Sequence, residues 1–93
     1  MTQKNTAIVT VLGKDRVGII ASISSVLAEM NINIKDISQT ILDDIFTMVM
    51  LVDLNNVNIE HSGIVEKLDK TGEELGVKIT IQHTDLFNAM HRI

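Results

Sequence analysis

The segment that most constrains the fold spans residues 7–30, where an apolar run is joined to an amphipathic pattern by a short polar turn. Residues 6–12 are aliphatic or β-branched at every position, a pattern typical of a strand covered on both faces. After the turn, apolar residues recur every three or four positions, as on one face of a helix. The segment therefore predicts a strand, a tight turn and a helix.

The polar turn carries most of the chemistry of this segment. Gly13 ends the predicted strand, and Asp15 stands where its carboxylate can accept hydrogen bonds from the first helical turn. Gly18 falls within that turn, where glycine costs up to about 1 kcal/mol relative to alanine, so its presence requires a local reason. The helix is expected to pack through an apolar stripe: Ile20, Ile23, Leu27 and Met30, widened by Ile19 and Val26.

Two further strands are expected in the middle of the chain. Apolar residues change parity near Lys35 and Asp36, which predicts a bulge in a strand over residues 32–41. The acidic pair at residues 43–44 predicts a hairpin turn into a strand over residues 46–54. One face of that strand is expected to enter the core, namely Phe46, Met48, Met50, Val52 and Leu54.

The last third of the chain predicts a second helix, an edge strand and a short terminal helix. The second helix is expected over about residues 60–75, with Gly76 in the left-handed conformation at its end. Apolar and polar residues alternate over residues 77–82, so this strand has one wet face. Thr84 can cap a helix over residues 84–93.

The order β-α-β-β-α-β predicts an α+β sandwich of ferredoxin-like topology, a single domain over residues 1–93 with its core in residues 6–83. Right-handed crossovers give a four-stranded antiparallel sheet of order 2-3-1-4, with both long helices on one face and the short C-terminal helix appended. The other sheet face then lacks a cover within the chain. Because such apolar faces mark interaction sites, we expect a homo-oligomer, at least a dimer.

Composition excludes several classes of function. Twelve acidic against eight basic residues give a net charge of −4, and the two aromatic residues provide no platform for stacking bases, so nucleic-acid binding is disfavoured. The absence of cysteine excludes disulfides and thiolate metal sites. No apolar segment is long enough for a signal peptide or a membrane span, and we expect a cytoplasmic protein without membrane contact.

Catalytic and cofactor signatures are not evident. The three histidines are widely spaced and no serine has a nearby base, so we expect neither a metal, a cofactor nor an enzyme. An acylphosphatase-like hydrolase stays open as an alternative, because Arg16 and Asn33 can mimic its arginine and asparagine. The other alternative is a pure interaction and oligomerisation module that binds no ligand.

The strand, the motif G-K-D-R-V-G-I, the helix and N-I-N-I together resemble the ACT domain, a small regulatory module of amino-acid metabolism. Asp15, Arg16, Gly18 and Ile19 match its D-R-P-G-[IL] motif, with valine for proline at position 17, and Asn33 and Ile34 match its G-x-N-I motif. Asn31 stands where glycine is frequent. The resemblance covers residues 6–83. D-I-S-Q-T, F-T-M and the ending F-N-A-M-H-R-I are similar to the stand-alone bacterial UPF0237 group, relatives of glycine-cleavage-system regulators.

This resemblance implies a non-catalytic sensor that binds a small molecule, an amino acid, at a homodimer interface and reaches a protein partner in trans. The site would be built from the first loop and the second strand. A helix N-terminus offers unpaired amides to a carboxylate, and amide or carboxylate side chains on the second strand can meet an ammonium group. The candidate ligand-binding residues are Lys14, Asp15, Arg16, Val17, Gly18, Ile19, Asn33, Ile34, Asp36 and Gln39.

Overall fold

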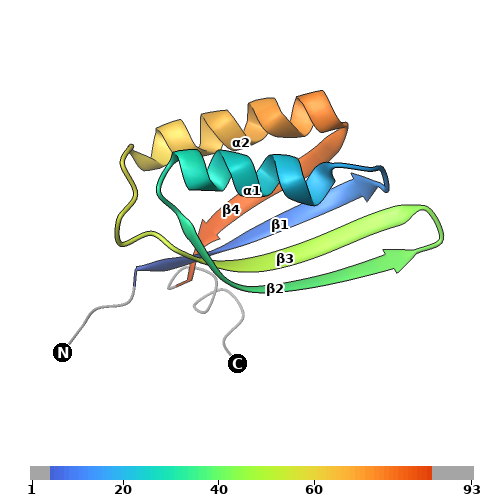
Figure 1. Ribbon diagram of the computed structural model, residues 1–93, viewed down its shortest axis with the longest axis horizontal. Coiled ribbons are helices and arrows are strands. Elements are labelled where there is room, and N and C mark those ends of the chain that lie inside the picture. The colour runs from blue at the N-terminus through green and yellow to red at the C-terminus, as the bar shows by residue number, and fades with distance from the viewer. Residues whose placement is uncertain (1–4, 85–93) are drawn as a thin grey trace.

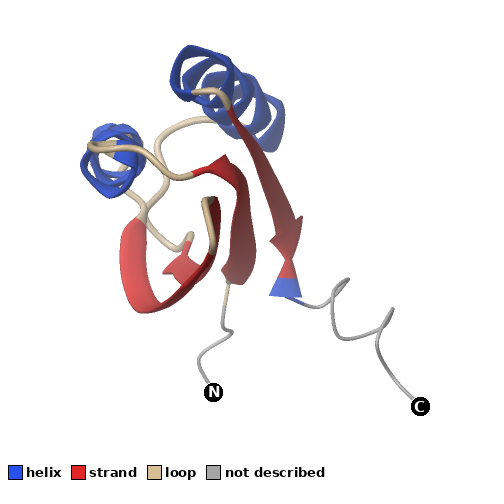
Figure 2. Cartoon of the chain, turned by 90° about the vertical axis from the view of Figure 1, so that its right-hand side faces the viewer, coloured by secondary structure: helices blue, strands red, loops and turns tan. Residues whose placement is uncertain are grey.

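The computed structural model describes residues 5–84 of the chain. Its elements follow in the order β1 (Thr6–Lys14), α1 (Ile19–Glu29), β2 (Asn33–Leu42), β3 (Ile45–Asp53), α2 (His61–Leu75) and β4 (Val77–His83). The strands form one antiparallel sheet of order β2-β3-β1-β4, and both helices lie on the same face of it (Figures 1 and 2). The predicted ferredoxin-like fold is therefore confirmed; the C-terminal helix expected over residues 84–93 lies outside the described residues apart from Thr84.

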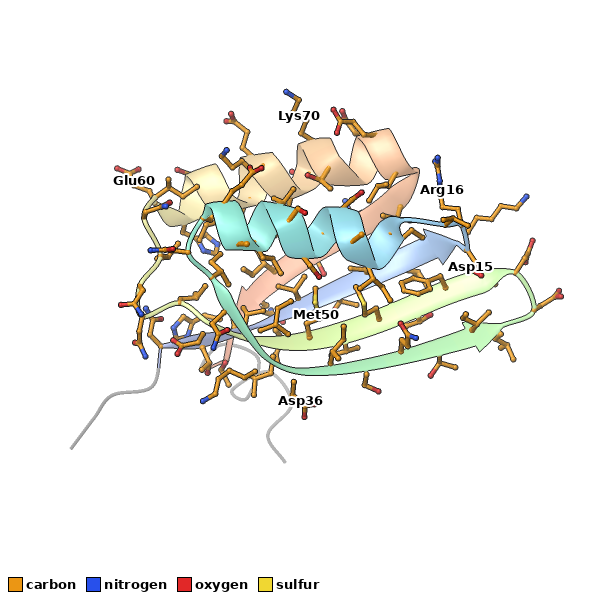
Figure 3. All side chains as sticks on the ribbon, viewed as in Figure 1. Asp15, Arg16, Asp36, Met50, Glu60 and Lys70 are labelled. Atoms are coloured by element: carbon orange, nitrogen blue, oxygen red, sulfur yellow. The ribbon has the colours of Figure 1, made fainter. Side chains whose placement is uncertain are left out.

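The core lies between the sheet and the helices, because alternate residues of β1 and β3 point to the helix side. Val9, Val11, Met48 and Met50 are fully buried there, and Figure 3 shows Met50 between β3 and the helix layer. The predicted core face of β3 is confirmed along its length. β1 is not covered on both faces as its apolar run suggested, because the described chain places helices on one side of the sheet only.

The start of α1 differs from the prediction. Gly18, with φ 94° and ψ −1°, occupies the N-cap position, and no side chain caps the helix. Asp15 lies upstream of the helix, and its backbone N–H donates to the carbonyl oxygen of Asp44 at 2.9 Å. β1 also runs through Gly13 to Lys14. Asp15 is thus a loop residue rather than a cap, because the chain crosses to the β2–β3 turn before it enters the helix.

The expected apolar stripe of α1 is confirmed except at one position. Ile23, Leu27 and Met30 are at most 1% exposed, as is Ile19, which was expected to widen the stripe. Ile20 is 39% exposed and lies outside it. The stripe therefore begins at Ile19, the first residue of the helix.

The turns confirm several predictions from local chemistry. The register of β2 against β3 shifts between Ile34 and Asp36, where the bulge was expected. Asp43 in the hairpin turn has φ 59°, and Asn31, which stands where the ACT motif often has glycine, has φ 60°. Gly76 ends α2 with φ 75°, and its N–H donates to the carbonyl oxygen of Gly72. Each position requires left-handed backbone, which asparagine, aspartate and glycine tolerate best.

Two surfaces of the sheet remain uncovered in the described part of the chain. On the face away from the helices, Leu12, Ile45 and Val49 are between 41% and 50% exposed. β2 forms one edge of the sheet, its hairpin with β3 extends beyond α1 (Figure 1), and every residue of β2 except Ile34 is exposed. β4 forms the opposite edge, as its alternating pattern predicted.

Candidate functional site

A cavity of about 250 Å³ lies between the β1–α1 loop and the outer part of β2. The sequence predicted five of its lining residues, and the fold brings them together: Asp15, Arg16, Gly18, Ile19 and Gln39. The loop lies beside β2 because Lys14 pairs with Ile45, which in turn pairs with Leu42 at the end of β2. Residues far apart in sequence therefore form one small concave site.

Four further residues line this cavity that the sequence did not predict as ligand-binding residues, namely Ile20, Ala21, Ile41 and Phe46. Ile20 and Ala21 belong to the first turn of α1, whereas Ile41 comes from β2. Phe46 is 3% exposed and contributes an apolar wall from β3. The sequence offered no signal for these four residues, since it placed Ile20 and Phe46 in the core; the 39% exposure of Ile20 appears only in the structure.

The N-terminus of α1 gives the cavity its electrostatic character. The first amide groups of a helix have no acceptor within the helix, and here no side chain caps them. The first-turn residues Ile20 and Ala21 border the cavity. A helix N-terminus carries partial positive charge, so this end of the cavity favours a carboxylate or another anion.

Gly18 is explained by backbone conformation rather than by close packing. A Cβ atom built on Gly18 would meet nothing within 4 Å, whereas its φ of 94° lies in the left-handed region. Glycine adopts that region at no steric cost. The residue thus allows the chain to turn sharply into α1, and it leaves open space beside the cavity.

Arg16 has a structural partner that the sequence did not reveal. Its Nη1 donates to the carbonyl oxygen of Leu75 at 3.2 Å, and Figure 3 shows the side chain directed towards the α2 side of the loop. Leu75 is the last residue of α2, where a cation interacts favourably with the helix dipole. The loop is therefore tied to α2 by Arg16 and to the hairpin turn by Asp15.

Two predicted loop residues do not line the cavity. Lys14 ends β1, and Val17 is 98% exposed at the tip of the loop. Neither position contacts β2 through this cavity. Val17 occupies the place of the usual proline in the motif, and its exposed apolar side chain is available to a second molecule.

The remaining predicted residues lie farther along β2. Asn33 pairs with Asp53 at the opposite end of the sheet, nine residues from Leu42, a separation of about 30 Å along a strand. It borders a different cavity, of about 530 Å³, with Asn31 and Asn56. One chain thus does not bring Asn33 to the loop.

Ile34 and Asp36 flank the bulge and also lie away from the cavity. Ile34 is half-buried and packs against the core. Asp36 accepts a hydrogen bond from the backbone N–H of Ile37 through Oδ1 at 2.8 Å, and its side chain points away from the helices (Figure 3). The geometry also separates Arg16 from Asn33, the two residues on which the acylphosphatase alternative depended.

The family follows from comparison with known proteins. A model of the ACT domain matches residues 5–82, which is nearly the whole described chain. The chain belongs to the ACT domain family. ACT domains are regulatory, ligand-binding domains, and the loop cavity coincides with the motif by which the sequence resembled them.

Relatives of similar length carry the UPF0237 name. The ACT chain is 59% identical over 87 residues to a UPF0237 protein of Methanopyrus kandleri, covering 94% of this chain and 97% of the relative. It is 54% identical to a UPF0237 protein of Clostridium acetobutylicum, and the match covers 94% of this chain and 98% of the relative. The solved structure of an ACT domain protein from Streptococcus pneumoniae superposes with a TM-score of 0.80 at 40% identity, covering 96% and 100%.

The described residues show two further properties of this ACT chain. None of its helices between residues 5 and 84 is both long and apolar enough to cross a bilayer. In the same range, no three histidine, aspartate or glutamate side chains gather in a group that could hold a metal ion.

Proposed function

We propose that this ACT chain is a non-catalytic sensor that binds an amino acid in the loop cavity, at the interface of a homodimer. The observation that carries the proposal is the uncapped N-terminus of α1, whose first turn borders a cavity also lined by Asp15 of the β1–α1 loop and Gln39 of β2. An amino acid is a zwitterion and needs an anion-binding group and a cation-binding group close together. The cavity offers both.

The two charged ends of the ligand are assigned by elementary electrostatics. The carboxylate would accept hydrogen bonds from the first-turn amides of α1. The ammonium group would donate to the Asp15 carboxylate or to the side-chain oxygen of Gln39. At about 250 Å³ the cavity is smaller than the roughly 300–1,000 Å³ usual for drug-sized ligands, which favours a small metabolite.

The second copy is inferred from the β2 edge. A long exposed edge strand invites pairing, and Ile37 and Ile41 are 43% and 52% exposed on its helix side. If β2 pairs antiparallel with β2 of a second copy about a two-fold axis, the Asn33 end of one strand lies beside the loop end of the other. The partner would then supply Asn33 to a loop cavity that a single chain leaves incomplete, whereas Asp36, whose side chain points away from the helices, would stay outside it.

This arrangement links ligand binding to assembly. A ligand held across the interface binds the dimer better than the monomer, so it stabilises the dimer by mass action. The same coupling changes the surface offered to a protein partner, with equal and reciprocal effects on the two affinities. Regulation in trans therefore requires no chemistry within the ACT chain.

Thermal unfolding against each of the twenty amino acids tests ligand binding. A ligand at 100 times its Kd adds about 2.7 kcal/mol, which raises the Tm of a domain this size by 10 °C or more. Gln39→Ala should reduce this rise in Tm. Ser38→Ala is the matched control and should retain it, because Ser38 pairs with Val49 and its side chain lies on the other face of the sheet. If no amino acid raises the Tm at millimolar concentration while the dimer persists, the chain is an interaction module.

Sedimentation equilibrium of two matched variants tests the interface. Ile37→Lys places a charge at the β2 edge, and Val49→Lys places one on the open sheet face, at residues 43% and 41% exposed. We expect Ile37→Lys to dissociate the dimer and Val49→Lys to leave it intact. The reverse result would place the interface on the open face and remove Asn33 from the site.

A further inference from the structure

A groove lies between β4 and α2, at the sheet edge opposite the loop cavity. It consists of adjoining cavities of about 430 Å³ and 280 Å³, and both are lined by Asp69, Lys78 and Ile79. β4 is the edge strand on this side, and α2 packs beside it on the helix face of the sheet (Figure 2). The groove is thus a trough bordered by a strand edge and a helix.

The exposed edge of β4 can accept another strand. β4 pairs with β1 in an unbroken register, from the pair of Gly13 with Val77 to the pair of Ala7 with His83. No other strand in residues 5–84 pairs with β4. In an antiparallel edge strand, alternate residues direct their N–H and C=O groups outward. Residues 77–81 contain neither a proline nor a bulge, two of the devices that block such an edge, and their one charged residue is Lys78.

The groove has an apolar floor and an acidic rim. Leu68 and Ile79 at its base are buried core residues, 1% and 3% exposed, so its accessible apolar surface comes from the half-buried Val65 of α2 and Ile81 of β4. Asp69 and Glu73, one helical turn apart on α2, are both exposed at the rim. Lys78 is the one basic residue that lines these two cavities. It pairs with Leu12, so its side chain points to the sheet face away from the helices.

These features select the side chains of an added strand. Every second side chain of that strand would lie on the helix side, above the apolar floor. A lysine or arginine at such a position can lay its aliphatic stem along Ile81 and Val65 and carry its charged head to Asp69 or Glu73. The backbone pairs with β4 while the alternate basic residues pair with α2.

We propose that the groove between β4 and α2 binds an extended segment of a partner protein with lysine or arginine at alternate positions. A second copy of this chain fits less well. Pairing β4 with β4 of another copy would place the two α2 helices side by side and bring their Asp69 and Glu73 carboxylates together, in a chain of net charge −4. The proposal concerns a different surface from the loop cavity and does not depend on the amino-acid ligand.

Fluorescence anisotropy with a labelled seven-residue peptide of alternating threonine and arginine tests the proposal on the full chain. We expect this peptide to bind. A control peptide with glutamate in place of each arginine should not bind. A version methylated on every backbone nitrogen keeps the charge but cannot donate backbone hydrogen bonds, and we expect it to lose binding. Equal binding of the methylated version would overturn strand addition.

Matched charge variants locate the site. Asp69→Asn with Glu73→Gln should weaken the threonine–arginine peptide by about tenfold, because two charge pairs are lost. Glu66→Gln with Glu74→Gln removes the same charge from other positions of α2 and should leave affinity within about twofold. Equal losses in both double variants would mean non-specific attraction to an acidic protein and would refute the assignment.

Hydrogen exchange and sedimentation distinguish the remaining occupants. The bound peptide should slow amide exchange within residues 77–81; protection confined to β2 would contradict the β4 assignment. If the peptide instead dissociates a dimer without added protection at β4, the occupant is a second copy and the proposal fails. Failure of every amino acid to raise the Tm would affect the sensor proposal alone.

Discussion

Gly72 provides a sharp test of how closely α2 packs on β4. In an exposed helix, alanine in place of glycine stabilises by up to about 1 kcal/mol. Here a Cβ on Gly72 would lie 2.6 Å from the carbonyl oxygen of Val77, whereas ordinary contacts begin at 3.4 Å. The helix and the strand must therefore separate by about 0.8 Å, the difference of these distances, because a backbone carbonyl cannot rotate away.

The opposing effects can be compared in magnitude. Overpacking a core contact costs about 1–3 kcal/mol, and a contact with backbone belongs in the upper half of that range. After the gain of up to about 1 kcal/mol from helix propensity is subtracted, Gly72→Ala should destabilise by about 1–2 kcal/mol, or roughly 5–15 °C in Tm. Gly63 is the matched control on the same helix, where a Cβ would meet only the end of the Ile59 side chain at 3.1 Å. Gly63→Ala should be neutral or stabilise by up to about 1 kcal/mol.

Urea unfolding followed by circular dichroism measures both variants on one scale. The midpoint should fall for Gly72→Ala and stay or rise for Gly63→Ala, with similar m-values if the denatured state is unchanged. If Gly72→Ala is as stable as Gly63→Ala, helix propensity dominates at both sites. The close approach of α2 to β4 would then be refuted, and the shape of the groove with it.

Substitutions at three further positions test the loops. Gly18→Ala should cost about 1–2 kcal/mol from its positive φ alone and Gly18→Asn less, in thermal melts; equal costs would contradict the left-handed assignment. Arg16→Ala should cost about 0.5 kcal/mol in low salt and almost nothing in 1 M NaCl, because its contact with the end of α2 is exposed and screened; a salt-independent loss would exclude this explanation. Asn31→Ala should cost about 1 kcal/mol whereas Asn31→Gly should not, and a loss on Asn31→Gly would show that its side chain matters more than its φ of 60°.

Local patterns predicted most of the fold. The order of strands and helices, the buried face of β3, the bulge before Asp36 and the end of α2 at Gly76 all follow from alternation, helical spacing and turn chemistry. Each of these features depends on residues that are close together in the sequence. Right-handed crossover rules then leave one reasonable order for four strands.

The candidate site was predicted only in part, because its geometry depends on contacts between distant segments. The D-R-V-G motif identified the loop, yet it did not show that Gly18 rather than Asp15 occupies the N-cap position. The backbone N–H of Asp15 is bonded to the carbonyl oxygen of Asp44 in the distant β2–β3 turn, so the helix begins only after this contact. It also did not show which residues of β2 face the loop. Gln39 does and Asn33 does not, since register with β3 decides the distance along the strand.

The sequence by itself determined which faces are apolar, where the chain turns and which family motif the loop carries. Only the tertiary structure decided that Arg16 is bonded to the last carbonyl of α2, 59 positions away, and that Asn33 lies at the opposite end of the sheet from the loop. The physical reason is range. Periodicity and backbone conformation act between neighbours, whereas a hydrogen bond between distant residues exists only after the sheet has paired and the helices have packed on it.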